Sequence, residues 1–88
     1  MEKDAEAVRK AAYSLAVVLR DKLKERVDTS SSRDGFKQIL KYYEKGLEFA
    51  AAGDDALHVG REDDAIDLYV QAKRQIGTAL YFARRLWP

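Results

Sequence analysis

The side chains best suited to chemistry in this chain gather around one predicted turn, within residues 54–64. The only histidine, His58, follows Asp54 by four residues, so the two share a face if this segment is helical. A carboxylate and an imidazole at this spacing can hold a divalent metal or tune a general base. A metal site needs further ligands, and the chain has no second histidine and no cysteine. We therefore interpret the pair as solvated side chains beside a turn and predict no metal site.

Two acidic pairs flank the same turn, Asp54 with Asp55 and Asp63 with Asp64. Glycosidase-type catalysis needs two carboxylates across a cleft, and one of them must be desolvated. A small helical chain rarely forms such a cleft, so acids on a helix surface and at a helix start are the better interpretation. Gly60 also lacks the glycine partners of a phosphate-binding loop. We predict no enzymatic activity, no catalytic residue and no cofactor.

Composition excludes several classes of partner. The 88 residues are 47% hydrophobic and 35% charged with a net charge of +1, which favours neither nucleic acid nor an anionic membrane. The longest apolar run, residues 15–19, is far shorter than the roughly 20 residues of a membrane span. The first ten residues are too charged for a secretory signal, and the lack of cysteine fits a reducing compartment. We predict a cytoplasmic protein without membrane insertion.

Apolar residues recur at spacings of three and four, which predicts helices over about residues 3–27, 32–59 and 62–86. The polar stretch at 28–33 predicts a loop in which Ser30, Ser31 or Ser32 caps the next helix. Gly60 follows the last periodic residue of the second segment, where a left-handed conformation is typical. Three helices with short loops predict one all-α domain over residues 1–88, an up-down-up antiparallel three-helix bundle.

Small residues indicate where the helices approach closely. Gly46 and Gly53 are seven residues apart, and a glycine inside a helix costs up to about 1 kcal/mol relative to alanine. Close approach of another helix would compensate, and Ala65 and Ala72 on the third segment would allow it. A kink near Gly53 is the alternative. The predicted core residues are Leu15, Leu19, Tyr43, Leu47, Leu68, Tyr69, Ala72 and Ile76.

Apolar residues exceed one narrow stripe per helix. On the second segment, for example, Tyr42 and Phe49 lie outside the main stripe. Each helix of a three-helix bundle has two neighbours, so broad stripes are expected; the alternative is an open groove that receives a partner helix. For that alternative we predict the groove between the first and third helices, with partner contacts at Val17, Ile66, Val70 and Tyr81.

The segment that begins at Gly60 carries a resemblance to a known family. An acidic pair, Ala65 and Tyr69 follow this glycine, and Ala72, Ile76 and Leu80 come after them. This pattern resembles the first hairpin of MIT (microtubule-interacting and trafficking) domains, which are three-helix bundles. The hairpin is also similar to a tetratricopeptide repeat. The resemblance covers about residues 36–82, and the additional predicted helix precedes the hairpin here, whereas it follows the hairpin in MIT domains.

The resemblance implies a function in protein recruitment. An MIT-like chain would be a non-catalytic module that binds the helical C-terminal tails of ESCRT-III-type subunits in an interhelical groove. The alternative is an engineered or self-associating bundle, such as a homodimer, with no natural ligand.

Overall fold

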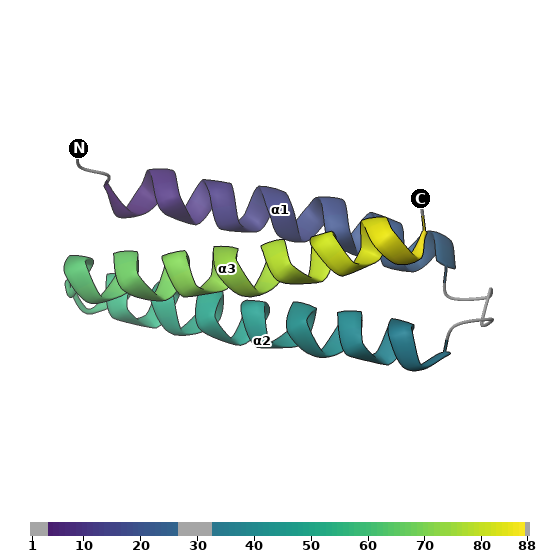
Figure 1. Cartoon of the computed structure of the whole chain (residues 1–88). Coiled ribbons are helices and arrows are strands. Elements are labelled where there is room, and N and C mark those ends of the chain that lie inside the picture. Colours follow the sequence, from purple (N-terminus) through teal and green to yellow (C-terminus); the bar gives the residue numbers. More distant parts are fainter. Residues whose placement is uncertain (1–3, 27–32, 88) are drawn as a thin grey trace.

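Three α-helices lie side by side in an elongated bundle of 45 × 22 × 15 Å (Figure 1). The computed structural model describes residues 4–26 and 33–87. The helices are α1 (Ala5–Arg26), α2 (Arg33–His58) and α3 (Glu62–Leu86), and these ranges contain no strand. α1 and α3 run in the same direction and α2 runs against them, so the predicted all-α three-helix bundle is confirmed (Figure 1). The predicted loop at 28–32 and its serine caps lie outside the described residues.

Local hydrogen bonds explain where α1 begins and where α2 ends. Asp4 caps α1, because its Oδ1 accepts a bond of 2.8 Å from the backbone N–H of Ala7. At the end of α2, Gly60 has a φ of 82°, which a glycine adopts without steric cost. The N–H of Gly60 bonds to the carbonyl of Leu57, and the N–H of the next residue bonds to that of Ala56. These two bonds form a Schellman motif, so the predicted turn at Gly60 is confirmed.

The core consists of three buried clusters that follow one another along the bundle. The cluster beside the α2–α3 turn contains Tyr69, whose side chain is fully buried. The middle cluster contains only Ala12, Ala50 and Ala72, one residue from each helix. The third cluster carries the larger aliphatic side chains, including Leu19 and Ile76. The fully buried side chains in the middle of the core are therefore small.

Two glycines of α2 lie directly against α3. A Cβ at Gly53 would stand 2.6 Å from Cε1 of Tyr69, and a Cβ at Gly46 would overlap the side chain of Ile76. α2 nevertheless runs as one helix through both positions. No break therefore interrupts α2 at Gly53, and α3 packs closely against both glycines, as expected. α2 and α3 share the most extensive contact in the bundle, and α1 packs mainly on α3.

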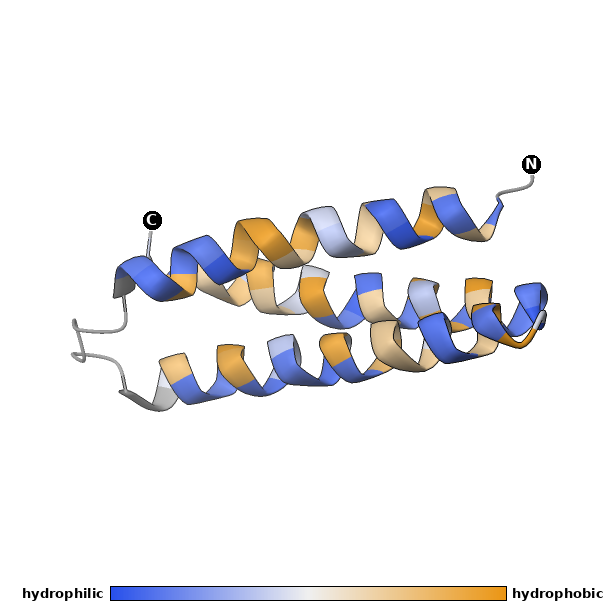
Figure 2. Cartoon of the chain, turned by 180° about the vertical axis from the view of Figure 1, so that it is seen from behind, coloured by the Kyte–Doolittle hydropathy of each residue, from blue (hydrophilic) through white to orange (hydrophobic). Residues whose placement is uncertain are grey.

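Most of the predicted core residues are buried or packed against the core. Leu19, Tyr69, Ala72 and Ile76 are fully buried. Three more are partly buried against the third cluster, namely Leu15, Tyr43 and Leu47. The prediction was wrong for Leu68, which is only partly buried and lines hollows at the surface. Figure 2 shows that each helix carries hydrophobic and hydrophilic positions along its whole length, and none of the described helices is long and apolar enough to cross a membrane.

Candidate functional site

A polar cluster centred on Asp54 joins the three helices near the α2–α3 turn. Arg9 Nε of α1 donates to Asp54 Oδ1 over 2.9 Å, and the Tyr13 hydroxyl donates to Oδ2 over 2.7 Å. The hydroxyl of buried Tyr69 donates to Oδ1 from α3. Arg9 also lies 5.0 Å from the centre of the Tyr13 ring. One carboxylate on α2 thus accepts hydrogen bonds from both other helices.

The surroundings of Asp54 keep it ionised. Partial burial alone would raise its pKa, but hydrogen bonds from Tyr69, Tyr13 and Arg9, with the charge of Arg9, lower it below its ordinary value. Burial and then the bond to Asp54 raise the pKa values of Tyr13 and Tyr69. At neutral pH the cluster therefore holds one carboxylate, one guanidinium and two neutral phenols. Through these hydrogen bonds the cluster ties the three helices together.

Replacing Asp54 with asparagine is expected to lower the free energy of unfolding by about 1 kcal/mol at neutral pH. The Asp54 side chain is 38% exposed, so solvent screening holds the effect at this size. A lowered folded-state pKa stabilises the fold only above the unfolded value of about 3.9, and this contribution disappears as the pH falls through the folded value. The difference between wild type and Asp54→Asn should therefore shrink in acid. Urea unfolding at several pH values measures it.

The adjacent Asp55→Asn variant is the matched control for this experiment. Asp55 is exposed, and its replacement should change the free energy of unfolding by no more than about 0.5 kcal/mol. A difference between wild type and Asp54→Asn that does not shrink as the pH falls below the unfolded value of about 3.9 and through the lowered folded-state pKa would contradict the role given to the Asp54 carboxylate.

Asp54 and His58, the pair whose spacing was considered for a metal, lie in different surroundings in the structure. Asp54 bonds to Arg9, Tyr13 and Tyr69, and His58 is exposed at the last turn of α2. Residues 4–26 and 33–87 contain no group of three metal-ligating side chains. The interpretation of Asp54 as only a solvated side chain was wrong. Sequence analysis missed its partners because Arg9 and Tyr13 lie more than 40 residues away along the chain.

A second candidate site is the groove between α2 and α3, called the outer groove below. Among the residues that the structure describes, four hollows follow it from the Gly60 turn to the other end of the bundle, and no described residue of α1 lines any of them. Its apolar lining residues include Tyr42, Phe49, Ala52, Ala56, Val59, Leu68, Phe82 and Leu86. The rings of Tyr42 and Phe82 stack across it with centroids 5.8 Å apart. The outer groove is therefore a row of hollows lined by both apolar and charged side chains, with an aromatic pair near one end.

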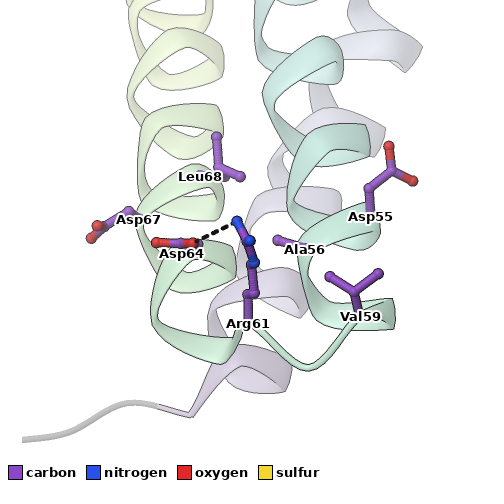
Figure 3. A pocket seen from close by; sticks show the side chains of 7 residues that line it. All are labelled: Asp55, Ala56, Val59, Arg61, Asp64, Asp67 and Leu68. Atoms are coloured by element: carbon purple, nitrogen blue, oxygen red, sulfur yellow. Dashed lines mark ion pairs between the residues drawn. The ribbon is translucent and has the colours of Figure 1, made fainter.

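The hollows of the outer groove suit side chains better than a small ligand. The most apolar one, formed by Ile39, Phe82 and Leu86 among others, has a volume of about 240 Å³, which is below the roughly 300–1,000 Å³ of ligand pockets. The hollow beside the turn is larger, about 850 Å³, but charged residues form much of its lining. Figure 3 shows Arg61 directed toward Asp64 there.

The structure brings together only two of the four partner contacts predicted from the sequence. Ile66 and Val70 are partly buried and pack against the cluster that contains Val8 of α1. Tyr81 follows Val70 by eleven residues, about 16 Å along α3, and is 56% exposed. Tyr81 contacts the ring of Phe82 instead.

Val17 lies on a different edge of α1 from the one assumed. It follows Tyr13 by four residues, and the Tyr13 hydroxyl points to Asp54 of α2. Val17 is 43% exposed on this α2-facing edge, away from the junction with α3. The spacing of apolar residues shows that a helix has a broad apolar face. It does not show which of the other two helices each edge of this face contacts. The four residues do not form one surface, and their role in partner binding stays a prediction.

Comparison with known proteins leaves the family of the chain open. No family model, curated protein or solved structure matches it. The resemblance to MIT domains and to tetratricopeptide repeats therefore remains a prediction carried by residues 36–82.

Proposed function

We propose that the chain is a non-catalytic interaction module that binds one amphipathic helix in the outer groove. The observation that carries this proposal is the row of four hollows between α2 and α3, which α1 does not cover. From Leu68 to Phe82 the row follows α3 for about 21 Å, the length of a helix of roughly four turns. A helix lying there would place an apolar residue in a hollow at each turn.

The affinity expected of such a site is micromolar. A micromolar complex corresponds to about 8 kcal/mol, and each buried aliphatic side chain contributes roughly 1.5–3 kcal/mol. About four anchored side chains are needed, because their contributions must also offset the translational and conformational freedom that is lost on binding. The stacked pair of Tyr42 and Phe82 favours binding, because its two rings are already held in place and lose little freedom.

The MIT resemblance supplies the first partners to test, the helical C-terminal tails of ESCRT-III-type subunits. A cytoplasmic location remains the expectation for such a module. A self-associating or engineered bundle without a natural ligand is the rival interpretation. The groove between α1 and α3 is the rival site, since it contains Ile66 and Val70.

Two charge substitutions on α3 separate these possibilities. Leu68 lines the outer groove, whereas Val70 lies two residues away on the edge next to α1. Fluorescence anisotropy with labelled tail peptides should show saturable binding to wild type. Leu68→Asp should weaken binding at least tenfold, about 1.4 kcal/mol, because a carboxylate replaces the apolar side chain that two hollows of the groove share. Val70→Asp should leave the dissociation constant within about threefold, provided that circular dichroism shows both variants folded.

The opposite order of effects would move the site to the groove between α1 and α3. The absence of saturable binding by wild type to any peptide, in protein shown to be monomeric, would refute the recruitment function.

A further inference from the structure

The sign of the charge reverses along the outer groove. Beside the Gly60 turn its lining residues include three acids, Asp55, Asp64 and Asp67, and one base, Arg61. Arg61 lies 3.8 Å from Asp64, which leaves Asp55 and Asp67 on the α2 and α3 sides of the hollow (Figure 3). We call this the acidic end of the groove.

The other end of the outer groove is basic. Lys41, Lys45 and Arg85 line the two hollows there, and the other lining residues of these two hollows carry no charge. Midway along the groove Glu48 and Lys45 face the same hollow, and their charges offset each other. Lys41 and Asp55 are 14 residues apart on α2, or about 21 Å. This exceeds the Debye length of about 8 Å at physiological ionic strength, so the two ends act as separate electrostatic sites.

We propose that the outer groove also binds a second copy of this chain, turned so that the acidic end of each copy faces the basic end of the other. A two-fold axis between the copies makes both charge contacts at once, and the partner presents the same surface. The chain itself supplies both halves of the complementary pattern. The bundle is 45 Å long and 22 Å wide, so one face can supply the roughly 800 Å² per partner of a stable interface.

Such a dimer would regulate helix binding in the outer groove, and this regulatory role rests on the proposed function. A second copy in the outer groove covers Leu68 and Phe82, where the partner helix is expected to lie. Helix binding and self-association then compete, and the apparent affinity for a helix falls as the protein concentration rises. A partner helix would convert dimers to monomers.

Charge exchange at the two ends of the groove tests the dimer. One variant carries Asp55→Lys and Asp67→Lys, and a second carries Lys41→Glu and Lys45→Glu; all four side chains are exposed. In sedimentation equilibrium the 10.0 kDa chain should associate to about twice this mass, less strongly at higher salt. Each variant alone should be monomeric, because its two groove ends then carry like charge.

Combining the two sets of substitutions tests whether opposite charges at the facing groove ends, rather than the native charges themselves, drive dimerisation. An equimolar mixture of the two variants should form a heterodimer, and a chain with all four substitutions should again form a homodimer. If circular dichroism shows that the lysine variant is unfolded, a neutral variant with Asp55→Asn and Asp67→Asn replaces it. This neutral variant should weaken dimerisation. Wild type that stays monomeric, single variants that dimerise like wild type, or recombined variants that stay monomeric would each overturn the dimer.

The two proposals fail separately in these measurements. Monomeric wild type that still binds tail peptides contradicts only the dimer. Dimeric wild type that binds no peptide, even when diluted to monomer, contradicts only the helix-binding function.

Discussion

A Leu19→Ala variant is expected to lose about 2–5 kcal/mol of unfolding free energy. Leu19 is fully buried, and three of the other α1 residues in the core are the alanines Ala5, Ala12 and Ala16. Leu19 therefore supplies much of the apolar contact between α1 and the α2–α3 pair. An 88-residue domain has only roughly 4–13 kcal/mol in total, so the variant would stand near the limit of folding.

The neighbouring Val18→Ala variant controls for helix propensity in this experiment. Val18 is 46% exposed, and its truncation should change stability by no more than about 0.5 kcal/mol. Urea unfolding followed by circular dichroism measures both variants. Equal midpoints for Leu19→Ala and Val18→Ala would show that α1 does not pack through Leu19.

Two glycine-to-alanine substitutions are expected to have opposite signs. Gly46→Ala should cost about 1–3 kcal/mol, because the new methyl group overlaps buried Ile76 and lies 3.2 Å from the carbonyl oxygen of Ala72. Gly77→Ala should stabilise the protein by up to about 1 kcal/mol. A Cβ at Gly77 meets nothing within 4 Å, and alanine is the better helix former.

The same unfolding experiment compares the two glycine variants directly. A stabilising effect of Gly46→Ala would mean that α2 and α3 are not in the close contact described here. An Ile76→Ala change should cost less in the Gly46→Ala background than in wild type, since it removes Cγ1 of Ile76, the atom nearest to the added methyl group.

The fold was predictable because its determinants are local. Three apolar stripes with a period near 3.6 residues mark the helices, and Gly60 marks the one turn that the structure describes. The close approach of α2 and α3 was also predictable, because glycines at 46 and 53 are costly inside a helix unless a neighbour packs closely, and they lie against Ile76 and Tyr69 of α3. These signals lie within single helices, where sequence spacing fixes geometry.

The sites were less predictable because they depend on which helix edges meet. The partners of Asp54 lie on other helices, and nothing near Asp54 in the sequence points to Arg9, Tyr13 or Tyr69. Leu68 has the same spacing as the core residues, yet it lies toward the outer groove. A useful signal was present in Tyr42, an apolar residue outside the main stripe of α2 that now lines the groove.

The central claim, that a partner helix lies in the outer groove, is tested most directly by mapping the bound peptide by NMR. Isotope-labelled protein, kept dilute enough to be monomeric, is titrated with a tail peptide while the amide and methyl shifts of the assigned residues are followed. The account predicts the largest changes at Phe49, Leu68 and Phe82, with little change at Ile66 and Val70. Changes centred on Ile66 and Val70, with none at Leu68 or Phe82, would contradict it.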